Sequence, residues 1–178
     1  MIALGEQQRC VGCGSSLPAQ DGPVHAYMIS SPACFAAFGQ VLAREYSSAE
    51  LMPAHRLTVD AWAVQHPGDG ARRAVQSVGL HLARLLIQLD DGVAGEDAHA
   101  RMLEFARRKA ELPPLSPPSS YRMTVADVVD AQDASAHRAA VERWARATLA
   151  DWAPHHGFIR RWIDEPGAHT LGDPLFRR

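Results

Sequence analysis

The sequence predicts an all-α protein, a helical bundle of five to six helices with a zinc-binding loop module at its N-terminus. Apolar residues recur at helical spacing over most of the chain, prolines and glycines separate these stretches, and all three cysteines lie within the first 34 residues. Strand-like alternation is confined to short stretches around the cysteines. The predicted organisation is a zinc-binding module at 1–34 packed on the bundle, the bundle itself at 35–165 and a loosely ordered tail at 166–178.

The first two helices have clear boundary signals. A helix is expected from Ser31 to Tyr46, because Ser31 is a good N-cap and Pro32 suits the first helical position. A second helix is expected over about 49–66, where the Pro-Gly pair that follows stops it.

The rest of the chain continues the helical pattern. A third helix is expected over about 70–90 and a fourth over about 95–111, followed by a proline-rich connector at 113–120 that cannot be helical. A capping-box-like start at Thr124 predicts one or two further turns, and a long final helical pattern should bend near Pro154.

Composition limits the functional classes. The net charge of −2 gives no basic field for nucleic acid, and no apolar run approaches the roughly 20 residues of a membrane span. The first residues do not have the pattern of a signal peptide. We therefore expect a cytoplasmic protein without nucleic-acid or membrane partners, whose thiols stay reduced; a homo-oligomer is compatible with this sequence.

The cysteines predict a metal site. Cys10 and Cys13 form a CxxCG knuckle, whose two-residue gap lets both thiolates face one ion. His25 and Cys34 would complete a closed Cys₃His set of the kind that structural zinc prefers. The fourth ligand is open at this point, since the Asp21 carboxylate or a water can replace His25. A redox CxxC pair is disfavoured because no βαβ pattern surrounds it.

A second group of polar residues lies in the helices. Asp60 and His66 belong to the second helix, His81 lies mid-helix among apolar residues, and His155 follows Pro154 at the expected bend. Histidines that project from several helices can build a catalytic or metal-binding pocket in a bundle core. The competing interpretation is that each is a hydrogen-bonded core or surface residue.

Five blocks in order carry a resemblance to a known family: CVGCGSSLP, DGPVHAYM with SSPACFAAFGQVLAREY, LTVDAWAVQHPG, QSVGLHL and WAPHH. Together, over about residues 9–165, they resemble an uncharacterised bacterial family, a domain of unknown function found in small cytosolic proteins. The resemblance implies that the CxxCG…H…C motif and the VDAWAVQHPG block belong to one architecture. It implies no reaction.

Three functions follow from these patterns, one of which makes the cysteine site itself reactive, as a metal or redox sensor. Another is a metal-dependent enzyme of the hydrolase or lyase type acting on a small molecule, with structural zinc at the cysteines. Its catalytic pocket would use Asp60, His66, His81 and His155, with or without a second metal ion of unassigned identity. The alternative is a non-catalytic, zinc-stabilised interaction or regulatory module.

Overall fold

The computed structural model describes residues 6–93 and 95–164; the predicted tail at 166–178 lies outside them. Two short antiparallel strands, β1 (Gln7–Arg9) and β2 (Ser16–Pro18), form a hairpin at the N-terminal end of the fold. The α-helices that follow are α1 (Pro32–Tyr46), α2 (Met52–Gln65), α3 (Arg72–Leu89), α4 (Gly95–Arg107), α5 (Ala134–Asp151) and α6 (His156–Asp164). Single 3₁₀ turns lie at η1 (Lys109–Glu111), η2 (Val125–Asp127) and η3 (Ala153–His155). The all-α prediction is confirmed.

The helix boundaries follow the local signals in the sequence. The hydroxyl of Ser31 caps α1 by accepting the N–H of Cys34 at 3.1 Å, and Pro32 is the first helical residue. Thr124 and Asp127 form the expected capping box, which here begins the single 3₁₀ turn η2. The final helical pattern breaks as expected at η3, which contains Pro154 and separates α5 from α6.

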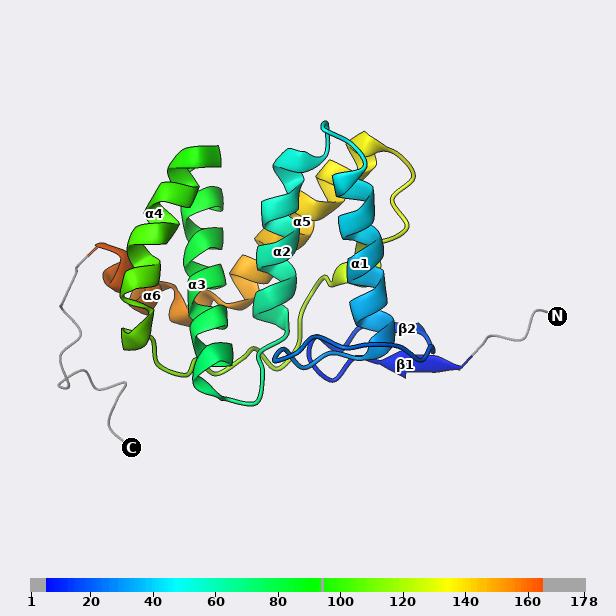
Figure 1. Cartoon of the computed structure of the whole chain (residues 1–178), viewed down its shortest axis with the longest axis horizontal. Helices are drawn as coiled ribbons and strands as arrows, with labels where there is room; N and C mark the ends of the chain where they lie inside the picture. The colour runs from blue at the N-terminus through cyan, green and yellow to red at the C-terminus, as the bar shows by residue number, and fades with distance from the viewer. Residues whose placement is uncertain (1–5, 94, 165–178) are drawn as a thin grey trace.

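Helix α2 is the centre of the bundle. It packs against α1, α3 and α5, while α3 also contacts α4 and α6 (Figure 1). In this view the axes of α1 to α4 stand side by side, and α5 crosses behind α2. The four tryptophans, Trp62, Trp144, Trp152 and Trp162, are all buried and are the largest of the fully buried side chains.

The arrangement brings the cysteine-bearing hairpin against one end of the helical bundle. The hairpin lies at the N-terminal end of α1, next to the C-terminal end of α2 (Figure 1). The proline-rich segment 113–121 runs without helix across the same end of the bundle. Among the described residues, no helix combines the length and apolar composition that crossing a bilayer requires.

Candidate metal centre

Four side chains meet where the hairpin touches the bundle. The sulfurs of Cys10, Cys13 and Cys34 and a ring nitrogen of His66 all lie within 4.8 Å of one another, and all four residues are buried. Nε2 of His66 is 3.5 Å from the sulfur of Cys10 and 3.3 Å from that of Cys34, and the sulfurs of Cys13 and Cys34 are 3.7 Å apart. The cysteines are free thiols, so the group offers three thiolates and one imidazole to an ion.

The hairpin turn positions the first two cysteines. Residues 10–14 close a tight turn in which the N–H of Gly14 donates to the carbonyl of Cys10 and the N–H of Cys10 donates to that of Ser15. Gly14 has a φ of +77°, a left-handed conformation that favours glycine. Gly12 has no such φ but leaves no room for a side chain, since a Cβ there would lie 2.6 Å from Cδ2 of His66. The knuckle is therefore packed directly against the fourth member of the group.

The start of α1 supplies the third sulfur. Cys34 is the third residue of the helix, where the partial positive charge of the N-terminus favours a thiolate. The backbone N–H of Ser31, the N-cap, lies 3.4 Å from the sulfur of Cys10 and donates to it. Such a hydrogen bond to a ligand sulfur orients it and partly offsets its negative charge.

His66 follows the last residue of α2 and is held by that helix. Its Nδ1–H donates to the carbonyl oxygen of Trp62 at 2.6 Å, and its ring stacks on the Trp62 indole with centroids 4.0 Å apart. Because a carbonyl can only accept, this bond fixes the tautomer and leaves Nε2 as the free lone pair facing the sulfurs. The orientation is that of a metal-ligating imidazole.

The members of the group strongly shift one another's pKa values. Burial lowers the pKa of His66, but hydrogen bonds and charge from Cys10 and Cys13 outweigh it and raise this pKa to about 9. Hydrogen bonds from Cys13 and Cys34 lower the pKa of Cys10, whereas hydrogen bonds to Cys10 and Cys13, together with burial, raise that of Cys34. A metal ion that binds here therefore competes with protons for the sulfurs and for Nε2 of His66.

His25, the histidine that the spacing favoured, lies elsewhere. Its Nδ1 accepts the backbone N–H groups of Tyr27 and Met28 at 3.4 and 3.2 Å, and its ring packs against the rings of Phe35 and Trp62. Neither His25 nor Asp21 belongs to the group that holds the three cysteines, where His66 is the fourth member. His25 instead organises the loop between the hairpin and α1.

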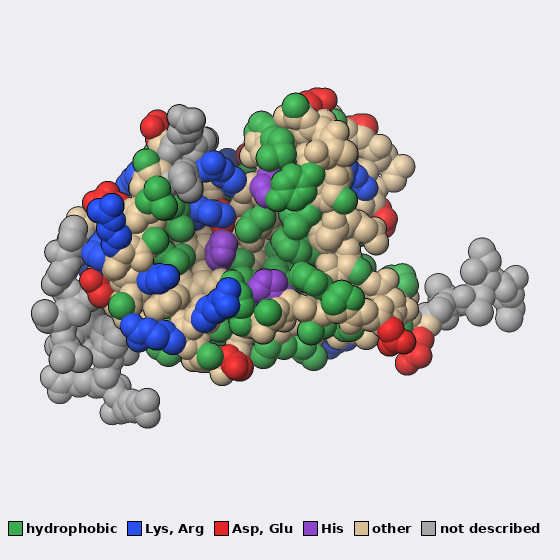
Figure 2. All heavy atoms as spheres, viewed as in Figure 1, with side chains coloured by type: hydrophobic (Ala, Val, Ile, Leu, Met, Phe, Trp, Pro, Cys, Tyr) green, Lys and Arg blue, Asp and Glu red, His purple; other side chains and the backbone are tan. Residues whose placement is uncertain are grey.

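The structure pairs two of the four residues proposed for a catalytic pocket. Asp60 is fully buried, and Nδ1–H of His81 donates to its Oδ1 at 2.7 Å. Arg84 forms a salt bridge with the same carboxylate, and Gln88 donates to it at 2.8 Å. The His81 side chain is 20% exposed, and its Nε2 has no partner among the described residues. On the face shown in Figure 2, Lys and Arg side chains gather over α3 and α4, and histidine side chains reach the surface of the same face.

The other two proposed catalytic residues are not with this pair. His66 lies at the cysteines, and Nε2–H of His155 donates to the carbonyl oxygen of Ser116 at 2.9 Å. Among the side chains that the structure describes, the Cys₃His group is the one set of three or more potential ligand atoms close enough to share an ion.

Sequence reasoning did not find a second buried polar cluster. Glu45 of α1 is fully buried and accepts hydrogen bonds from Thr58 and from both His55 and His137, each histidine at 3.0 Å. Nδ1 of His137 lies 3.3 Å from a nitrogen of Arg44, which donates to it. The sequence feature that could have indicated this cluster is Glu45, a glutamate in the last turn of an otherwise apolar helix. These hydrogen bonds link α1, α2 and α5, and they leave both carboxylate oxygens of Glu45 with partners.

Comparison with curated proteins and with solved structures found no match. A family model does match, over residues 8–153, and this range contains all four members of the Cys₃His group as well as Asp60 and His81. The chain belongs to this family, which is described as a family of unknown function, DUF5946.

Proposed function

We propose that this chain is a zinc protein and that Cys10, Cys13, Cys34 and His66 are the ligands. The observation that carries the proposal is the spacing of the donor atoms. Zn–S bonds of about 2.3 Å and a Zn–N bond of about 2.0 Å at tetrahedral angles require sulfurs roughly 3.8 Å apart and a nitrogen roughly 3.5 Å from each sulfur. The separations of 3.3 to 3.7 Å are already close to these values.

The zinc would be structural. Three thiolates and an imidazole fill all four tetrahedral positions, and catalytic zinc usually keeps one position for water or substrate. The ligands come from the hairpin, the first turn of α1 and the end of α2, so the ion joins three segments that are distant in sequence. Its role would be to fasten the hairpin to the bundle.

Native mass spectrometry and elemental analysis of the purified chain test the proposal. We expect one zinc per chain in the wild type, loss of most zinc in His66→Ala, and full zinc content in the matched variant His25→Ala. Zinc retained in His66→Ala and lost in His25→Ala would contradict the ligand assignment, and a different bound metal would contradict the identity of the ion.

A second candidate function is an enzyme of the hydrolase or lyase type acting on a small molecule. The observation in its favour is the Asp60–His81 pair, in which a buried carboxylate orients an imidazole and leaves its other nitrogen free. This is the arrangement by which a carboxylate holds a general base. The oxygens of Asp60 are occupied by His81, Arg84 and Gln88, so the pair is better suited to move a proton than to ligate an ion.

Turnover of ester, phosphoester and carbon–oxygen lyase substrates by the zinc-loaded chain tests this candidate. General-base catalysis contributes about 10²- to 10⁴-fold, so His81→Asn should reduce turnover by at least about 100-fold. His155→Gln changes a histidine that is bonded to a backbone carbonyl and serves as the control. Absence of turnover in all three classes, or full activity in His81→Asn, would favour the non-catalytic interaction or regulatory module instead.

A further inference from the structure

A tyrosine at the end of α1 is hydrogen-bonded to a histidine of α2. The hydroxyl of Tyr46 lies 3.2 Å from Nε2 of His55, and the centroids of the two rings are 4.7 Å apart. Tyr46 is the last residue of α1 and is 66% exposed, so its side chain is open to solutes. The pair belongs to a different part of the molecule from the Cys₃His group, because the hairpin lies at the other end of α1 (Figure 1).

The carboxylate of Glu45 determines which nitrogen of this histidine carries the hydrogen. Nδ1 of His55 lies 3.0 Å from Oε2 of Glu45, and because a carboxylate only accepts, Nδ1 carries the hydrogen. In the neutral ring the lone pair is then on Nε2, so the Tyr46 hydroxyl donates to it. The histidine therefore contacts the phenol through the nitrogen that can take its proton.

Glu45 is itself held in place by groups of α2 and α5. It is fully buried, and its Oε1 accepts hydrogen bonds from the Thr58 hydroxyl and from Nε2–H of His137 at 3.0 Å. Nδ1 of His137 accepts from Arg44, which also donates to the carbonyl of Val129 at 2.8 Å. The other carboxylate oxygen is thereby left to the histidine of α2.

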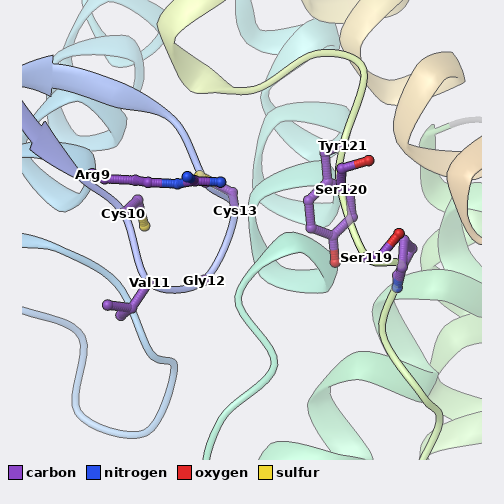
Figure 3. Close-up of a pocket in the computed structure, with 10 residues that line it drawn as sticks. Arg9, Cys10, Val11, Gly12, Cys13, Ser119, Ser120 and Tyr121 are labelled. Atoms are coloured by element: carbon purple, nitrogen blue, oxygen red, sulfur yellow. The ribbon is translucent and has the colours of Figure 1, made fainter.

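The other two tyrosines of the chain have different surroundings. Tyr121 lines the pocket between the knuckle and the segment 118–121 (Figure 3), and its hydroxyl donates to the carbonyl of Val64 at 3.3 Å. Tyr27 lies under Arg73, whose guanidinium carbon is 4.2 Å from the centre of the ring. Among the described side chains, Tyr46 is therefore the one tyrosine whose hydroxyl is bonded to a histidine that a carboxylate holds.

We propose that Tyr46 is a nucleophile that accepts acyl groups, with His55 as its general base and Glu45 as a positioning residue. A weak nucleophile is activated when a base lies within hydrogen-bond distance of it and a third group orients the base. As the phenolic oxygen forms a bond to the carbonyl carbon of the donor, its proton moves to Nε2 of His55. The bond from that carbon to the leaving oxygen then breaks, and the leaving group takes this proton. The products are an ester on Tyr46 and a free alcohol or phenol.

An uncharged acyl donor suits these residues better than a phosphoryl donor. Phosphoryl transfer relies on arginine, lysine or a metal ion to neutralise the charge of the transferred group. Of the nearby arginines, Arg44 is hydrogen-bonded as described above, and Arg138 forms a salt bridge with Glu50 in the α1–α2 connection. The carboxylate of Glu45 also disfavours a further negative charge beside it. An activated ester, whose leaving group departs easily, fits a nucleophile that lies at the surface.

Incubation of the purified full chain with p-nitrophenyl acetate, followed by peptide mass spectrometry, tests the proposal. We expect Tyr46 to be acetylated faster than Tyr27 in the same sample. His55→Gln should slow acetylation of Tyr46 by about 100-fold, the lower end of what a general base contributes, and should leave that of Tyr27 unchanged. An unchanged rate at Tyr27 also reports that the variant is folded.

His156→Gln is the matched control, because His156 is also partly buried but donates from Nε2–H to the carbonyl of Leu149 at 2.8 Å. It should leave acetylation of Tyr46 at the wild-type rate. For the positioning role of Glu45, nitrogen chemical shifts of the neutral His55 ring should show the hydrogen on Nδ1 in the wild type. Glu45→Gln, whose amide can donate to Nδ1, should move part of the hydrogen to Nε2 and slow the acetylation of Tyr46.

Three results would overturn the proposal: acetylation of Tyr46 no faster than that of Tyr27, a wild-type rate in His55→Gln, or a hydrogen on Nε2 of His55 in the wild type. Equal slowing by His55→Gln and His156→Gln would do the same. The acetylated residue is identified directly, so this outcome is separate from zinc content and from turnover at Asp60 and His81.

Discussion

The close contact between Gly12 and His66 gives the sharpest test of the metal centre. In Gly12→Ala the new methyl group would overlap the carbonyl oxygen of Ile29 and lie 2.6 Å from Cδ2 of His66. Ordinary contact begins at 3.4 Å, so the imidazole would have to recede by about 0.8 Å if the backbone stays in place. A metal ligand tolerates a displacement of only about 0.2 Å. The substitution should therefore remove His66 from the ion without changing any ligand residue.

The expected loss of zinc affinity is about 100-fold, the upper end of the range for disturbing the groups that support a ligand. Overpacking of a tight contact should also destabilise the zinc-bound fold by about 1–3 kcal/mol. Competition with a chromophoric zinc chelator measures the affinity, and urea denaturation measures the stability.

Gly39→Ala is the control, because Gly39 lies in α1 with no atom near the position of a Cβ. Alanine there should leave zinc affinity unchanged and stabilise the helix by about 0.5–1 kcal/mol. If Gly12→Ala binds zinc as tightly as the wild type, the knuckle does not press on His66 and the proposed geometry of the centre is refuted.

Three further outcomes follow from contacts described above. Burial, then the charges of Arg73 and His66, lower the pKa of His25, while the unfolded residue takes up its proton near pH 6.5. The free energy of unfolding should therefore be highest above about pH 6.5 and fall as the pH drops towards the pKa of folded His25. In His25→Asn, denaturation curves should show a weaker dependence of this free energy on pH. An equal dependence in the variant and the wild type would contradict the prediction. Glu45→Ala leaves buried partners unpaired and should cost at least about 3 kcal/mol in urea denaturation, whereas the exposed Glu50→Ala should cost less than about 1 kcal/mol; similar losses would contradict the buried cluster. Removal of zinc by a chelator should leave far-ultraviolet circular dichroism nearly unchanged, because α3, α4, α5 and α6 contribute no member of the Cys₃His group, and should speed hydrogen exchange in residues 7–18; complete unfolding would be the contrary result.

Local signals in the sequence predicted most of the fold. Ser31 and Pro32 marked the start of α1, and Pro154 marked the bend between α5 and α6, because caps and prolines act within one turn of the backbone. The length of the turn at Thr124 was less well determined, since tertiary packing decides whether a capped turn continues into a helix.

The candidate site was predictable only in part. The three cysteines are close in sequence, and the knuckle spacing and helix start explain why they share a site. His66 follows Cys34 by 32 residues, and its place is set by how α2 packs on α1, which no local pattern encodes. His25 lies between the cysteines in sequence, but its lone pair is used by the loop backbone. Asp60 and His81 are partners because α2 and α3 pack together. This pairing could be foreseen, because the two residues lie in successive helices.

The position of His66 directly after α2 sets the order in which the four proposed ligands are synthesised. The nascent chain has both knuckle cysteines after residue 13 and the third sulfur after residue 34, but the imidazole that completes the set is made only at residue 66. Until α2 has emerged and packed on α1, the chain can offer an ion three thiolates and an open position. On the proposed ligand assignment, capture of the ion would be a late step in folding, because it would join the hairpin to a histidine translated 56 positions after Cys10.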